Sequence, residues 1–163
     1  MRNLITSVID AVTQREPRPP LPPPCEIDDP VVGCFRLQRA QGWFQQDRRV
    51  ADGRIVRVIL HAVDKPGAEA ILPDARDFQH HLDTWLDRMK DCAVAKLMTA
   101  AREHCADYGV LGPAEFKAAL RGRAVGFHGG GRFDAEFDAG EIFGDRTVCV
   151  YGTLAEGVTR AEF

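Results

Sequence analysis

Acidic and apolar residues alternate along residues 132–138, and this segment offers the best-defined arrangement of reactive side chains in the sequence. In a β-strand, the apolar residues would face a core, whereas Asp134, Glu136 and Asp138 would line the opposite face. Three carboxylates in a row repel one another, so they need cations, water or a basic partner opposite them. We therefore expect a surface that binds positive charge.

The segment that follows adds acidic and aromatic residues to this surface. Carboxylates steer a basic protein towards its binding site, and aromatic side chains supply contact area. The predicted partner-binding residues are Asp134, Glu136, Asp138, Glu141, Phe143, Asp145 and Tyr151. A toxin that acts on nucleic acid would be such a basic partner. The alternative is that the acidic row pairs with this protein's own arginines between residues 36 and 57, on a neighbouring strand.

A second interpretation is an enzymatic site built from a histidine and a carboxylate. His128 precedes the glycine turn of residues 129–131, and Glu136 or Asp138 could act with it as general acid and base. The protein would then be a small hydrolase or transferase with a cleft beside the turn. An exposed acidic strand rarely provides the burial that shifts a carboxyl pKa, so we assign no catalytic residue.

The other reactive side chains form no recognisable motif. His80 and His81 are adjacent on a predicted helix and diverge, although Asp77 and His81 could share one face. His104 and Cys105 diverge in the same way. We expect no metal site and no cofactor.

Length, charge and cysteine usage exclude several classes of protein. The 163 residues suffice for one domain with a core, and the net charge of −3 argues against direct nucleic-acid binding. The five cysteines are irregularly spaced and indicate no disulfide framework. No segment reads as a signal peptide or membrane span, so we expect a cytoplasmic protein.

The N-terminal residues 1–25 are expected to lie outside the domain. Residues 3–15 have the spacing of an amphipathic helix, and residues 17–24 are a proline-rich spacer in the extended polyproline conformation. The helix could dock on a second copy of the chain, which would make the protein an oligomer or a subunit of an assembly.

Residues 26–163 are predicted to form a single α+β domain. The helices are expected to be one long helix that starts at Pro73-Asp74 and stops at Gly109, and a short helix from Pro113 to Arg121. The predicted strands are residues 32–37, 43–46, 54–62, 124–127, 132–138, 147–153 and 158–163. This order indicates an antiparallel sheet of two β-meanders with the helices packed on one face.

Five segments of the chain also resemble a known protein family. They are residues 28–37, 42–44, 87–91, 113–116 and 132–144. Together they are similar to an uncharacterised bacterial family, domain of unknown function 2262, over roughly residues 26–163. The family pattern continues with a histidine after Gly144, where this chain has Asp145.

The resemblance implies no established activity, cofactor or catalytic residue. Small bacterial families of this kind often resemble the immunity partners of secreted toxins, which is an analogy of size, composition and style. Together with the acidic surface, it leads us to expect a bacterial immunity protein that inhibits a cognate toxin by occluding its active site.

Overall fold

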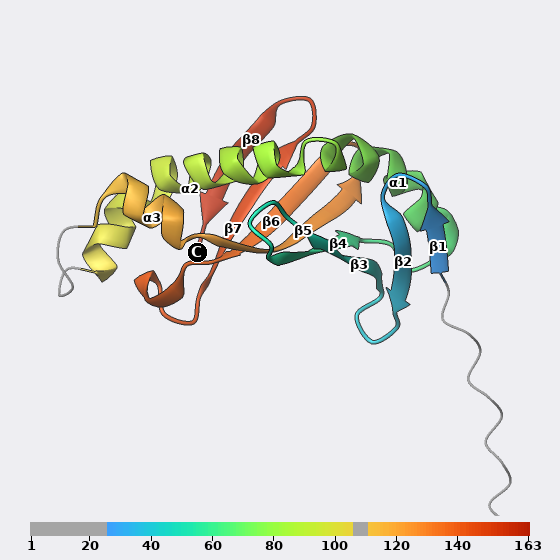
Figure 1. Cartoon of the computed structure of the whole chain (residues 1–163), viewed down its shortest axis with the longest axis horizontal. Helices are drawn as coiled ribbons and strands as arrows, with labels where there is room; N and C mark the ends of the chain where they lie inside the picture. The colour runs from blue at the N-terminus through green and yellow to red at the C-terminus, as the bar shows by residue number, and fades with distance from the viewer. Residues whose placement is uncertain (1–25, 106–110) are drawn as a thin grey trace, which may run out of the picture.

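The computed structural model describes residues 26–105 and 111–163 (Figure 1). The predicted N-terminal helix, the proline-rich spacer and Gly109 lie outside the described residues. The strands are β1 (Glu26–Asp29), β2 (Gly33–Gln38), β3 (Trp43–Arg49), β4 (Ile55–Leu60), β5 (Arg121–Gly129), β6 (Arg132–Asp138), β7 (Thr147–Thr153) and β8 (Gly157–Glu162). The helices are α1 (Lys65–Gln79), α2 (Leu82–His104), α3 (Pro113–Ala119) and the short 3-10 helix η2 (Gly140–Ile142).

The described strands form one sheet, in the order in which they occur along the chain. Neighbouring strands are antiparallel except for β4 and β5, which are parallel. The parallel pair arises because the chain leaves β4, passes through α1, α2 and α3, and returns beside β4 in the same direction. The prediction of an α+β protein is therefore confirmed, but the sheet is mostly antiparallel rather than antiparallel throughout, because the pairing of β4 with β5 was not predicted.

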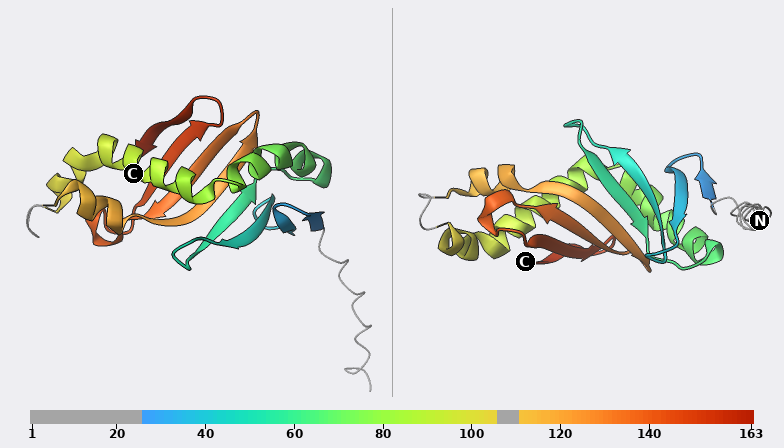
Figure 2. Two further views of the ribbon diagram at one scale, coloured as in Figure 1. Left: turned by 45° about the horizontal axis from the view of Figure 1, so that its top comes forward. Right: turned by 90° about the horizontal axis from the view of Figure 1, so that it is seen from below.

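The helices lie along one side of the sheet (Figures 1 and 2). α1 packs against β1, β4 and β5, whereas α2 packs against β7 and β8 and also contacts α3. None of the helices in the described ranges is long and apolar enough to span a bilayer.

The helical region begins earlier than the sequence predicted. Asp64 caps α1, because its side chain accepts a hydrogen bond of 2.9 Å from the backbone N–H of Gly67. Pro66 lies in the first turn, where its missing N–H costs nothing. The prediction of a start at Pro73-Asp74 was wrong, because Pro73 lies inside α1.

The single long helix of the prediction is two helices, which meet at His80 and His81. The break is hidden in the sequence, because the buried residues Phe78, Leu82 and Leu86 continue at helical spacing across it. α1 packs on β1, β4 and β5 whereas α2 packs on β7 and β8, so the two helices cover different parts of the sheet.

The alternation of residues in β6 is confirmed. Phe133, Ala135 and Phe137 are buried on the helix side, whereas Asp134 and Glu136 are partly exposed and Asp138 is exposed. The aromatic residues on this side meet at Phe78 of α1, whose ring centroid lies 5.2 Å from that of Phe127 and 5.3 Å from that of Phe133. This packing leaves the acidic residues on the side of the sheet away from α1 and α2.

Candidate functional site

The sheet face away from the helices, called the open face below, carries polar side chains from β4 to β8. The register places Asp134 of β6 between Gly126 of β5 and Tyr151 of β7. Glu136 lies in the same way between Ala124 and Cys149. The carboxylates are therefore flanked by small residues on the β5 side and by a thiol and a phenol on the β7 side.

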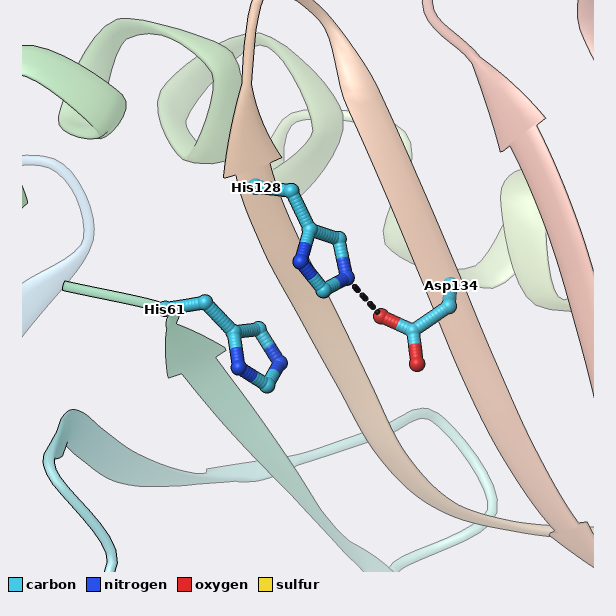
Figure 3. A group of neighbouring side chains, drawn as sticks. All are labelled: His61, His128 and Asp134. Carbon is cyan, nitrogen blue, oxygen red and sulfur yellow. Dashed lines mark hydrogen bonds and ion pairs between the residues drawn. The ribbon is translucent and has the colours of Figure 1, made fainter.

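Two histidines and an aspartate meet at one point on this face (Figure 3). His128 Nε2 lies 2.6 Å from Asp134 Oδ1, which is a short hydrogen bond or ion pair. The ring of His61 is stacked on that of His128, with 4.2 Å between centroids and an interplanar angle of 10°. Each of the three residues offers one ligand atom, and these atoms lie within 4.8 Å of one another.

The backbone of β4 and β5 places the two histidines side by side. His61 follows β4 directly, and its backbone N–H donates a 3.0 Å hydrogen bond to the carbonyl oxygen of Phe127. This bond extends the parallel pairing by one residue and brings His61 beside His128. His128 and Asp134 lie on the two strands joined by the turn of residues 129–131, whose glycines all have a positive φ.

Gly126 provides the space in which the side chains of His61 and Asp134 approach each other. A Cβ atom at this position would lie 2.5 Å from Asp134 Oδ1 and 2.6 Å from His61 Nε2, closer than atoms in van der Waals contact. Any side chain here would therefore displace His61 and Asp134.

The surroundings of His61 favour the neutral form of its imidazole. Burial lowers its pKa and the neighbouring His128 adds to this effect, while Asp134 and Glu136 act in the opposite direction. The edge of Trp43 also contacts the imidazole, with 5.6 Å between ring centroids. A neutral imidazole retains a lone pair on one ring nitrogen, so His61 can accept a proton or bind a metal ion.

A hollow of about 410 Å³ adjoins His128 on the β7 and β8 side. Its lining includes His128, Arg132, Tyr151 and Arg160. The hydroxyl of Tyr151 donates a 2.9 Å hydrogen bond to Glu162 Oε1, and this contact with the carboxylate raises the pKa of Tyr151 to about 12. Tyr151 therefore remains a neutral phenol, and Arg160 lies 4.1 Å from the centre of its ring.

The neighbouring Cys149 is not an activated nucleophile. Burial raises the pKa of its thiol, and the nearby carboxylate of Glu136 raises it further. The chemistry of this face therefore depends on imidazole and carboxylate groups.

Comparison with protein families identifies the domain. A family model described as an uncharacterised protein conserved in bacteria, domain of unknown function 2262 (DUF2262), matches residues 29–163. The chain belongs to the DUF2262 family. The predicted resemblance is thus confirmed, and His61, His128 and Asp134 all lie within the matched residues of the DUF2262 domain. No match was found among the curated proteins or among the solved structures.

The structure of this DUF2262 domain divides the predicted partner-binding residues into two groups. Asp134, Glu136 and Tyr151 lie at the centre of the open face. The exposed Asp138, Glu141 and Asp145 line a second hollow of about 340 Å³, together with Arg123 and Arg146. The acidic residues therefore face arginines of the same chain at the second hollow.

The prediction that Phe143 anchors a partner does not fit its position. Its side chain is only 4% exposed and is stacked on Phe163, with 4.1 Å between ring centroids. Phe143 follows η2 and turns inward to the core, where Phe116 also contacts it.

The arginines of residues 36–57 do not lie on a strand next to the acidic row. Arg57 of β4 and Glu136 of β6 are both in register with Ala124, but β5 separates them. Arg54 pairs instead with Asp52 in the turn before β4.

The sequence prediction missed His61 and assigned no role to Asp134 beyond the acidic row. The sequence did contain a signal for His61. It continues the alternation of β4 on the face opposite to the buried Val56, Val58 and Leu60. The alternative metal ligands Asp77 and His81 are exposed on α1 and at the start of α2, outside this cluster. Among the described residues, His61, His128 and Asp134 are the one group with the spacing of metal ligands.

Proposed function

We propose that this protein binds another protein through the open face of its sheet and acts as an immunity protein that occludes the active site of a cognate bacterial toxin. The observation that supports this proposal is the acidic row of β6, partly exposed at Asp134 and Glu136 and exposed at Asp138, on a sheet face that the helices leave uncovered. Glu136 has no ion-pair partner within the described residues, and the small Ala124 beside it leaves its carboxylate accessible.

The mechanism proposed is steric occlusion guided by charge. Asp134, Glu136 and Asp138, extended by Glu141 and Asp145, would approach the basic groups of a toxin's active cleft and speed association. Tyr151 is the remaining aromatic anchor, because Phe143 is buried. Nucleic acid would be the target of the partner rather than a ligand of this protein.

Charge reversal on β6 tests the proposal. The double variant Glu136→Lys and Asp138→Lys should weaken binding by at least about tenfold, because like charges across an interface cost several kcal/mol. The measurement is capture of the partner from the bacterial host, identification by mass spectrometry, and titration of the purified pair.

The control is Glu69→Lys together with Glu156→Lys, which reverses two exposed carboxylates outside the open face and should leave the affinity unchanged. Equal affinity of the β6 variant and the wild type would rule out this surface. Recovery of a partner without toxin activity would retain the binding surface and exclude the immunity function.

A second candidate function is a small hydrolase or transferase, and the 2.6 Å contact between His128 and Asp134 beside a hollow favours it. His128 would act as the general base and Asp134, rather than Glu136 or Asp138, would orient it. Screening ester and phosphoester substrates with the wild type and with His128→Gln tests this reading, which fails if neither protein has activity.

Self-association through residues 3–15 is a separate proposal about residues outside the described part of the chain. Light scattering of the full chain, with and without Ile5→Asp and Ile9→Asp, tests it. A monomeric wild type would exclude it.

A further inference from the structure

We propose that His61, His128 and Asp134 bind one divalent transition-metal ion of the zinc class, with at least one coordination position open to solvent. This site goes beyond the proposed binding of a protein partner and does not depend on it. The argument rests on the donor set, the spacing of the ligand atoms and the space above Gly126.

The donor set suits an ion of this class. Imidazole nitrogen and carboxylate oxygen are ligands of zinc, and two histidines with one carboxylate also hold iron, cobalt and nickel. All three side chains reach the solvent-accessible open face, so water, a substrate oxygen or a partner's side chain could complete the coordination. An incomplete protein ligand set is typical of catalytic rather than structural zinc.

The spacing of the ligand atoms is close to that of a bound ion. Ligand atoms at about 2.1 Å from a tetrahedral ion lie about 3.4 Å from one another. The three ligand atoms here lie within 4.8 Å of one another, and His128 Nε2 lies 2.6 Å from Asp134 Oδ1. Metal binding thus requires the His128–Asp134 pair of ligand atoms to move apart by less than about 1 Å. The two distances from the ligand atom of His61 would have to shorten by roughly 1.5 Å at most.

The space for the ion is created by the glycine of β5. His61 Nε2 and Asp134 Oδ1 lie 2.6 Å and 2.5 Å from the point that a Cβ atom of residue 126 would occupy. They therefore converge above Gly126, and an ion would lie on the solvent side of this point. A β-strand with a large side chain at this position could not hold the same arrangement.

One ring must turn before both imidazoles can face the ion. The rings of His61 and His128 are nearly parallel, so their in-plane lone pairs do not meet at one point. Within the described residues, the ring of His61 forms no hydrogen bond, whereas the ring of His128 is hydrogen-bonded to Asp134. We expect His61 to turn about its Cβ–Cγ bond, a terminal torsion with a broad energy profile.

Arg132 and Arg160 lie beside His128 at the adjoining hollow, but the strand beneath the cluster carries no positive charge at this point. Asp134 contributes one carboxylate, and Glu136 lies two residues further along the same face of β6. Lys and Arg are absent from the two β5 positions opposite these carboxylates, which are Gly126 and Ala124. A divalent ion therefore meets no fixed positive charge from the strand directly beneath it.

Metal titration of the full chain tests the site in the absence of any partner. Chelator-treated protein is titrated with Zn²⁺ by calorimetry and with Co²⁺ by visible absorption, and one ion per chain is expected. His61→Gln, His128→Gln and Asp134→Asn should each weaken binding at least tenfold, since even residues that only support metal ligands change affinity about 10–100-fold. Gly126→Ala should have the same effect although it retains every ligand.

Two control variants separate this site from other metal-binding groups. His80→Gln with His81→Gln removes the exposed adjacent histidines, and Cys34→Ser removes an exposed thiol outside the cluster. Both should bind Zn²⁺ like the wild type. Thermal melting of every variant establishes that it is folded, and Zn²⁺ should raise the melting temperature of the wild type and the controls alone.

Several outcomes would overturn the proposal. They are absence of binding to the wild type, equal affinity in folded His61→Gln and His128→Gln, and loss of binding in either control. The cluster would then be a hydrogen-bonded His128–Asp134 pair with a stacked imidazole. Because no partner is present in these titrations, this result would leave the proposed protein-binding function untouched.

Discussion

Replacing Phe78 with alanine is expected to lower the free energy of unfolding by about 3–5 kcal/mol, the usual cost of removing a buried aromatic ring. Phe78 is 1% exposed, and its ring stacks on Trp85 with 5.2 Å between centroids. It also meets Phe127 and Phe133 edge to face, so it joins α1 to β5 and β6. Urea unfolding measures the change.

The control for this prediction is Val63→Ala. Val63 is 79% exposed, and its truncation should change the free energy of unfolding by no more than about 0.5 kcal/mol. His128 and Asp134 follow Phe127 and Phe133 directly in the β5–β6 hairpin. Phe78→Ala should therefore also loosen the histidine cluster. A loss below about 1 kcal/mol for Phe78→Ala would mean that the core collapses around the missing ring.

Replacing Asp29 with alanine is expected to cost about 2–3 kcal/mol of stability. Asp29 is the one buried charged residue in the described part of the chain, and its side chain is 2% exposed. Its Oδ1 accepts hydrogen bonds from the N–H groups of Val31 and Val32, at 2.9 and 3.0 Å, and its Oδ2 pairs with Arg76. The loss is smaller than for a fully buried pair because the Arg76 side chain is 43% exposed and regains water.

The same contacts make part of the stability depend on pH. The hydrogen bond from Arg76 is the main cause that lowers the pKa of Asp29 from 3.8 to about 2. A lowered pKa means that the unfolded chain binds the proton more readily, so the contribution is present above about pH 4 and is lost as the pH falls through about 2. It amounts to about 2 kcal/mol.

Unfolding of the wild type and of Asp29→Asn between about pH 5 and pH 2 measures this contribution. The difference in stability between the two proteins should shrink as the pH falls. Glu69→Ala serves as the control, because the Lys65–Glu69 pair is exposed and should contribute about 0.5 kcal/mol or less. A constant difference across this pH range would show that the charge of Asp29 does not contribute.

The sequence predicted best those strands in which one face is buried and the other is polar. β6 and β7 have the predicted bounds, 132–138 and 147–153, because alternation with period two is visible in the residues themselves. β1 was missed because its four residues, Glu-Ile-Asp-Asp, contain a single apolar position. Pairing with β2 and the contact between Asp29 and Arg76 hold it in place instead.

Helix boundaries depended on packing that the sequence pattern does not express. The spacing of Phe78, Leu82 and Leu86 is the same across the break between α1 and α2 as within a single helix. α1 and α2 pack on different strands, and these contacts between distant parts of the chain are not visible in the periodicity of the sequence.

The sequence by itself determined the α+β class, the family and the acidic row on the polar face of β6, because each depends on residues that are close together in the chain. Only the tertiary structure decided that Phe143 is buried and that His61 meets His128 and Asp134. His61 and His128 are separated in the chain by α1, α2 and α3 and by most of β5. They meet because β4 and β5 pair in parallel and Gly126 leaves space between them, and neither fact follows from local sequence.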